Sequence, residues 1–182
     1  MTKRIAAVLL ALGLGGCFES DGSLYDGAAA LHPFQGGAVV SRAKDGKPGH
    51  LRLSSDGEGY RFIITDKGHD FGEGYRLRFF ALPDGPAGTL VFEATELCGA
   101  GDKTCKPVPA ASLRYYGLVR PTGRGAEEFN PVCGKTSLFA RLHGVTAKDY
   151  DTCHFTTRAA LEKALLMLAR QKPKADTVYR YQ

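Results

Sequence analysis

Short stretches of alternating apolar and polar residues make up most of this chain, and clusters of turn-forming residues separate them. Alternation with a period of two is typical of strands that bury one face, and Gly- and Pro-containing clusters allow tight reversals between them. Strands are predicted at residues 38–42, 50–54, 60–65, 75–82, 89–95, 112–120 and 127–132. We therefore expect a mainly β (α+β) fold, in which a six- to seven-stranded antiparallel meander forms a small barrel or a sandwich.

Near the C-terminus the apolar residues recur at a helical spacing instead. Within residues 156–171 ("TTRAALEKALLMLARQ") one helical face holds Leu161, Ala164, Leu165 and Leu168. A threonine before the segment suits a helix cap, cations occupy the last turn, and Pro173 follows. We expect one C-terminal α-helix near residues 157–171 that packs on the sheet, in preference to one that binds a partner. Residues 177–181 ("TVYRY") are expected to return as an edge strand.

The first sixteen residues have the layout of a cleavable export signal. Two cations stand near the start, twelve uncharged residues follow, and Gly15 and Gly16 precede Cys17. Such a stretch is too short to cross a bilayer as a helix, which takes about twenty residues. We therefore interpret residues 1–16 as a signal peptide rather than a membrane anchor.

The sequence "LGGC" at residues 14–17 resembles the lipobox of bacterial lipoproteins; an ordinary signal peptide with a chance cysteine is the alternative. The resemblance implies cleavage before Cys17 after a diacylglycerol has been attached to its sulfur. Two or three acyl chains, palmitate among them, hold a protein at a membrane stably, whereas a single chain holds it only marginally. Phe18 stands where an inner-membrane retention signal would have Asp. We therefore expect a lipid anchor in the outer membrane, facing the periplasm.

The organisation expected from these features is a signal peptide (1–16), a lipidated tether (17–30) and one globular domain (31–182). Acidic, small and turn-forming residues dominate the tether, which argues against a packed element before residue 31. The formal net charge is +5, and it falls to +3 without the two cations of the signal. This mild balance does not indicate a nucleic-acid partner.

Four cysteines remain when Cys17 is set aside, and an oxidising compartment predicts that they form two disulfides. They are Cys98, Cys105, Cys133 and Cys153. We favour Cys98–Cys105, which closes a small loop, and Cys133–Cys153, which ties the last strand to the start of the helix. A four-cysteine zinc site is the competing interpretation, but neither pair has the usual two-to-four-residue gap. No metal and no other cofactor is expected.

Two of the predicted strands, 75–82 and 112–120, carry arginines at alternate positions. The side chains expected on the outside of the sheet are Arg76, Arg78, Phe80, Arg114, Tyr116 and Arg120. If the two strands are neighbours, these residues form a basic and aromatic binding patch, because arginine suits carboxylate and phosphate groups. The alternative is a solvated sheet face whose cations prevent edge pairing.

Local signatures of catalysis are missing from the sequence. "CGKTS" (133–137) resembles the end of a phosphate-binding loop, but Phe129 stands where that loop needs a glycine. There is no Gly-x-Ser-x-Gly and no His-Glu-x-x-His, and the five histidines are scattered. We therefore expect no enzyme and assign no catalytic residues.

"NPVC" and "CHFTTRAALEKAL" together resemble a pattern of uncharacterised proteobacterial envelope lipoproteins, which implies location and class but no activity. The function expected is a membrane-anchored envelope lipoprotein that serves as a non-enzymatic binding or scaffolding module. Its partner is expected to be an anionic envelope component or an envelope protein. An inhibitor of an exported hydrolase and an enzyme with a dispersed active site are the alternatives.

Overall fold

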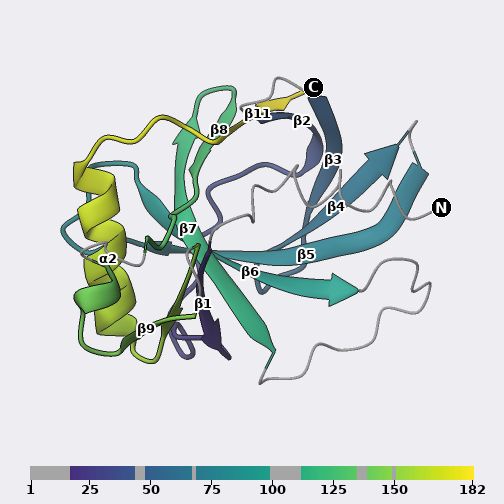
Figure 1. The fold of residues 1–182 in the computed structure, drawn as a ribbon. Coiled ribbons are helices and arrows are strands. Elements are labelled where there is room, and N and C mark those ends of the chain that lie inside the picture. The colour runs from purple at the N-terminus through teal and green to yellow at the C-terminus, as the bar shows by residue number, and fades with distance from the viewer. Residues whose placement is uncertain (1–16, 44–47, 67–68, 99–111, 135–138, 149–150) are drawn as a thin grey trace.

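The computed structural model of the protein describes residues 17–43, 48–66, 69–98, 112–134, 139–148 and 151–182. This part of the chain is mainly β, with eleven strands in one sheet and a single α-helix (Figure 1). The strands are β1 (Cys17–Asp21), β2 (Gly37–Ala43), β3 (Pro48–Ser55), β4 (Tyr60–Asp66), β5 (His69–Ala81), β6 (Leu90–Cys98), β7 (Leu113–Thr122), β8 (Gly125–Phe129), β9 (Val145–Ala147), β10 (Thr152–Phe155) and β11 (Thr177–Tyr181). The helical elements are a 3₁₀ turn, η1 (Phe139–Arg141), and α2 (Arg158–Arg170). No helix in the described ranges is long and apolar enough to cross a membrane.

Eight of the strands close into an antiparallel barrel. β2 to β8 follow one another as a meander, and β11 returns to pair with β8 on one side and β2 on the other. This confirms the barrel of the two expected architectures, but there are more strands than the six or seven predicted. The prediction that residues 177–181 form an edge strand is wrong, because β11 closes the barrel and has a partner on both sides.

Three short strands extend the sheet outside the barrel. β1 pairs antiparallel with the first half of β7 and parallel with β10, and β9 pairs with β10. The expectation that residues 17–30 are a tether without packed structure is therefore wrong. Phe18 and Tyr25 are fully buried, and the Phe18 ring lies against the rings of Phe139 and Phe155. A five-residue strand with three polar residues is too short for its alternation to be recognised in the sequence.

The barrel wall separates two apolar cores. Side chains on its inner face form the first: Val39, Leu51, Leu53, Tyr60, Phe62, Tyr75, Phe79, Phe92, Ala94, Val119, Ala126 and Tyr179. The second lies between the outside of the wall, the N-terminal segment and α2, and includes Phe18, Tyr25, Phe80, Val91, Tyr116, Leu118, Phe129, Phe155, Leu161 and Leu165. Strands β5 to β7 thus bury apolar side chains on both faces.

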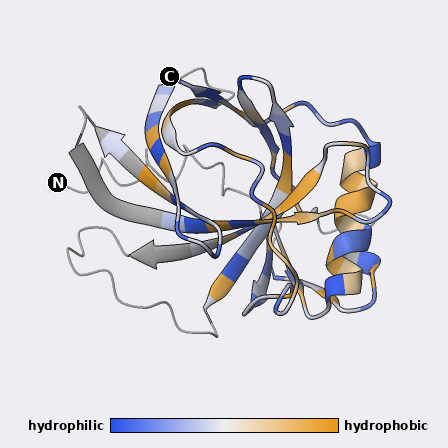
Figure 2. Cartoon of the chain, turned by 180° about the vertical axis from the view of Figure 1, so that it is seen from behind, coloured by the Kyte–Doolittle hydropathy of each residue, from blue (hydrophilic) through white to orange (hydrophobic). Residues whose placement is uncertain are grey.

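Helix α2 confirms the predicted C-terminal helix and its packing on the sheet. The Thr157 side chain accepts a hydrogen bond from the Ala160 N–H over 3.3 Å and caps the first turn. The predicted apolar face is buried, with Leu161 and Leu165 fully covered. Figure 2 shows this apolar surface of α2 next to the apolar residues of the neighbouring strands.

The Cys133–Cys153 disulfide is present, with 5.3 Å between the two Cα atoms. It ties the segment after β8 to β10. Both cysteines are fully buried and belong to the second apolar core, outside the barrel wall. The other predicted pair, Cys98–Cys105, lies outside the described residues, because Cys105 and the side chain of Cys98 are not described.

Closure of the barrel depends on close contact between β8 and β11 at Gly125. A Cβ at this position would lie 2.0 Å from the Tyr179 carbonyl oxygen, whereas one at Gly123 in the same turn would meet nothing within 4 Å. We expect Gly125→Ala to lower the free energy of unfolding by about 1 to 3 kcal/mol, because it pushes β11 away. Gly123→Ala is the control and should change it by less than about 0.5 kcal/mol in urea titrations. Equal effects of the two substitutions would contradict this account of closure.

Candidate binding site

A partly open cavity of about 60 Å³ lies inside the barrel. Its wall is almost entirely apolar and includes Leu53, Phe62, Phe79, Phe92 and Val119. A single buried water needs roughly 10 to 15 Å³, so the cavity has room for more than one water or for a compact apolar group. An eight-stranded barrel is wide enough either to be filled by its own side chains or to hold one small ligand.

The cavity exists because several inward positions of the barrel carry small side chains. Ala94 on β6 and Ala126 on β8 both point inward, are buried and line the cavity. Gly125 also lines the cavity, and only its backbone contributes to the wall. These small side chains leave part of the barrel interior unfilled.

Glu128 on β8 is the one acidic side chain among the described residues of the cavity wall. It is buried, and each carboxylate oxygen accepts a hydrogen bond. The Asn130 side-chain amide donates to Oε1 over 2.8 Å, and the Tyr179 hydroxyl on β11 donates to Oε2. Burial is the main cause that raises the pKa of Glu128 to about 7, and the nearby Asp176 carboxylate contributes to the rise. The two hydrogen bonds lower the pKa, but they offset only part of the effect of burial. Burial and the Glu128 charge also raise the pKa of Tyr179 well above its usual value.

The neighbouring Glu127 lies on the other face of β8. It is partly exposed, and its carboxylate lies 3.5 Å from an Arg120 guanidinium nitrogen. Because successive side chains of a strand point to opposite faces, one glutamate faces solvent and the next faces the cavity. Sequence reasoning missed Glu128. Alternation around the apolar Phe129 would place Glu128 on the outer face of the predicted strand, but Phe129 itself faces the core outside the barrel.

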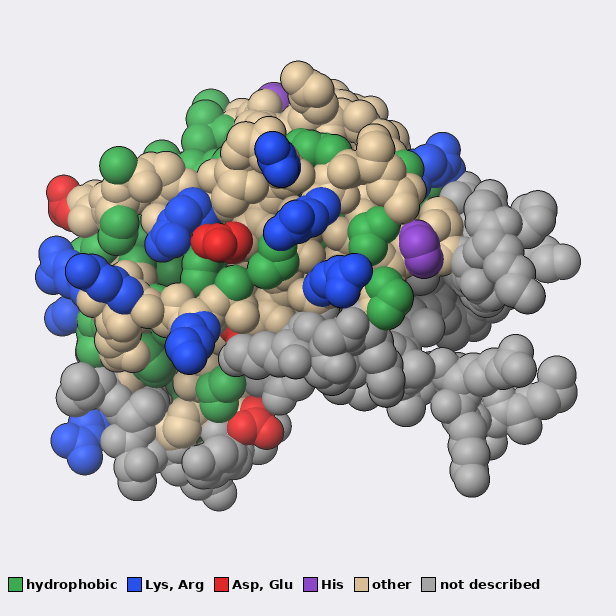
Figure 3. Space-filling model, turned by 90° about the horizontal axis from the view of Figure 1, so that it is seen from above, with side chains coloured by type: hydrophobic (Ala, Val, Ile, Leu, Met, Phe, Trp, Pro, Cys, Tyr) green, Lys and Arg blue, Asp and Glu red, His purple; other side chains and the backbone are tan. Residues whose placement is uncertain are grey.

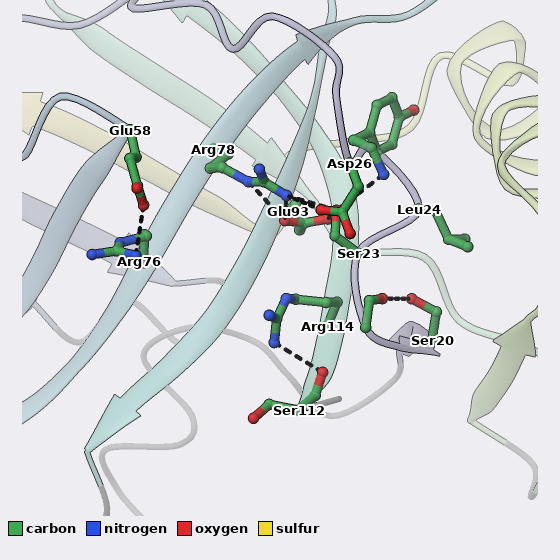
Figure 4. Close-up of polar contacts among 12 residues, drawn as sticks. Ser20, Ser23, Leu24, Asp26, Glu58, Arg76, Arg78, Glu93, Ser112 and Arg114 are labelled. Carbon is green, nitrogen blue, oxygen red and sulfur yellow. Dashed lines mark hydrogen bonds and ion pairs between the residues drawn. The ribbon is translucent and has the colours of Figure 1, made fainter. Parts of the chain in front are cut away.

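Each arginine of the predicted patch has a local partner. The Arg76 guanidinium lies 2.9 Å from both the Asp56 and the Glu58 carboxylates, and that of Arg114 donates to the Ser112 carbonyl over 2.8 Å (Figure 4). Arg120 pairs with Glu127, as described above. Because β6 lies between β5 and β7, the two arginine-bearing strands are not neighbours.

Arg78 and Tyr116 belong to a buried polar network around Glu93 on β6. Arg78 Nη2 lies 2.6 Å from Glu93 Oε1, and the Ser23 hydroxyl donates to Oε2 over 2.6 Å (Figure 4). The Tyr116 hydroxyl donates to the same carboxylate over 3.2 Å and accepts a hydrogen bond from the Leu24 N–H. The prediction that Tyr116 is exposed is therefore wrong: the N-terminal segment covers this face, and only 2% of the residue is accessible.

Exposed arginines gather instead on another wall of the barrel. Four adjacent strands, β4, β3, β2 and β11, each carry one outward-pointing, exposed arginine. We call these residues the arginine wall: Arg61, Arg52, Arg42 and Arg180. Among the described outward side chains of these four strands none is acidic. Figure 3 views this side from above, and Lys and Arg are more frequent there than Asp and Glu.

Metal-binding geometry is not found in the described ranges, where no group of three or more His, Cys, Asp and Glu side chains could hold an ion. No protein-family model matches the chain, and no curated protein or solved structure matches it significantly. Any assignment of function therefore depends on the cavity, the Glu128 carboxyl and the arginine wall.

Glu128 should make the stability of the protein depend on pH. Its pKa is about 7 in the folded chain, against 4.5 for an ordinary glutamate, so the folded state binds the proton more tightly. The contribution of Glu128 to the free energy of unfolding should therefore be largest at low pH. It should fall as the pH rises from about 4.5 to about 7. We expect Glu128→Gln to remove this fall and to stabilise the protein at pH 8 by roughly 1 to 3 kcal/mol.

Urea titrations at pH 5 and pH 8 measure this effect. Glu127→Gln is the matched control, since it removes a carboxylate from the outer face of the same strand. From pH 5 to pH 8, the free energy of unfolding should fall more in the wild type and in Glu127→Gln than in Glu128→Gln. A parallel loss in all three proteins would contradict the assignment.

Proposed function

We propose that the protein is a lipid-anchored binding module of the cell envelope whose barrel holds a small, mainly apolar ligand. The observation that carries this proposal is the apolar cavity inside the closed barrel, with one buried carboxyl in its wall. Ligand sites are commonly concave, mostly apolar and provided with few polar groups. The lipobox resemblance at residues 14–17 supports the envelope location and the anchor at Cys17.

The apolar surface that a ligand buries sets the expected affinity. A compact aromatic body that buries about 150 Å² of apolar surface gains roughly 4 kcal/mol at about 25 cal/mol per Å². Part of this gain is offset by the entropy lost on association. A one-ring ligand without a strong polar contact should therefore bind with a dissociation constant of about one millimolar or weaker.

Filling the cavity should abolish binding. We expect benzyl alcohol, a compact neutral probe, to show saturation-transfer NMR signals with the full chain carrying Cys17→Ser, which is made without its lipid. Ala126→Leu places three further carbon atoms in the cavity and should remove these signals, and the smaller change Ala94→Val should weaken them. Ala38→Leu adds the same group on the outer face of β2, where Ala38 is exposed, and is the control.

Circular dichroism should show that all four proteins keep the β-rich fold. Signals that persist unchanged in both Ala126→Leu and Ala94→Val would show that the probe binds elsewhere. An absence of signals from the Cys17→Ser protein itself would contradict the proposed function.

The arginine wall favours a second contact, with an anionic component of the envelope. The wall is centred on β2 and β3, and β3 lies four strands from β7 around the barrel. β1, which begins at Cys17, pairs with β7, so the wall faces away from the strand that would carry the lipid. We therefore propose that the wall binds the carboxylate-bearing polymer of the cell wall rather than the membrane that holds the anchor, because arginine suits carboxylates.

Replacing the four arginines of the wall with Gln should reduce retention of the lipid-free protein on peptidoglycan sacculi. The control replaces four exposed cations on α2 and after it, Lys163, Arg170, Lys172 and Lys174, and changes the net charge equally. Retention of the wild type should weaken with salt, which screens exposed charges beyond roughly 8 Å at physiological ionic strength. Equal retention of both variants, or a preference of the wild type for anionic phospholipid vesicles, would contradict the proposed partner.

A further inference from the structure

The Glu128 carboxylate occupies a costly position unless a further group pairs with it. Moving an ionised carboxylate out of water costs several kcal/mol, and pairing or full hydrogen bonding has to offset this. Among the described residues, Glu128 has no ion pair. Glu127, one residue away, has Arg120 as its partner on the outer face. Within the described part of the chain, the charge inside the barrel is therefore left without a counter-ion.

The carboxylate also has unused capacity to accept hydrogen bonds. An ionised carboxylate offers about four acceptor positions, and the described donors use two of them, one from Asn130 and one from Tyr179. Both donors hold the carboxylate in place at the seam between β8 and β11. The side chain lines the cavity, so a bound molecule reaches it from inside the barrel.

The surroundings of Glu128 favour a cation over an anion. Among the described residues, the titratable groups that act on it are Tyr179 on β11 and Asp176 before β11, and neither carries a positive charge. Thr177 and Asn130 add only neutral polar groups. The aromatic rings of the cavity wall, among them Phe62 and Tyr179 with centroids 5.8 Å apart, offer faces that attract cations.

We propose that Glu128 is the group that selects the ligand of the barrel, and that the ligand has a compact apolar body and one ammonium group directed at this carboxylate. This inference rests on the proposed function, because it assigns a chemical class to the ligand of the same cavity. The ammonium would supply the missing counter-ion and donate into the free acceptor positions. Ligands with an anionic group in the same place would be repelled by the carboxylate.

Three probes with the same ring distinguish the possibilities: benzylamine, benzyl alcohol and benzoate. Calorimetric titration of the full chain carrying Cys17→Ser at pH 8 should give at least tenfold tighter binding of benzylamine than of benzyl alcohol, and no binding of benzoate. Glu128→Gln should reduce the amine-to-alcohol ratio to about one. Glu127→Gln, the matched control, should keep the wild-type ratio.

The pH dependence of binding gives a second readout. Benzylamine affinity should fall by about tenfold from pH 8 to pH 6, because the Glu128 carboxyl with its pKa of about 7 becomes protonated. Benzyl alcohol affinity should change little, and the fall should disappear in Glu128→Gln. If benzyl alcohol binds without any preference for the amine, or if benzoate binds best, the inference is overturned and the proposed function stands. If none of the three binds, both are overturned.

Discussion

The structure depends on closure of the barrel by β11. This strand comes last in the chain, yet it forms backbone hydrogen bonds with β8 on one side and β2 on the other. Without it, β2 and β8 would have free edges, and the inner face of the sheet would be open to water. Gly125 allows the close approach of β8 and β11, and the hydrogen bond from Tyr179 to Glu128 crosses the same seam. The element that closes the barrel therefore also holds the candidate binding group.

The outer face of the barrel explains why the N-terminal segment is structured rather than a tether. Glu93 is buried there, and Arg78, Ser23 and Tyr116 satisfy its carboxylate. Removing one partner of such a network leaves an unpaired buried charge, which costs more than the network contributes. The segment from β1 to Tyr25 supplies Ser23 and covers the network, so it belongs to the fold. A lipid on Cys17 would then hold the barrel close to the membrane.

The local pattern of the sequence was sufficient for the barrel strands and for α2, because alternation and helical spacing are properties of a few consecutive residues. It also placed Arg76 and Arg78 on the outward face correctly. What it could not provide was the identity of the neighbours: β6 separates the two arginine strands, and residues 20–26 cover Tyr116. Glu128 was missed for a related reason, since an inward carboxylate becomes unusual only when the face it shares is known to be a cavity.

We propose that the barrel interior receives an apolar ligand at the Glu128 carboxylate. A crystal structure of the lipid-free protein with benzylamine tests it most directly. We expect the aromatic ring to lie among the apolar side chains of the cavity and the ammonium nitrogen to lie about 3 Å from a Glu128 carboxylate oxygen. A barrel interior that contains no ligand, with benzylamine bound only at the outer surface, would contradict it.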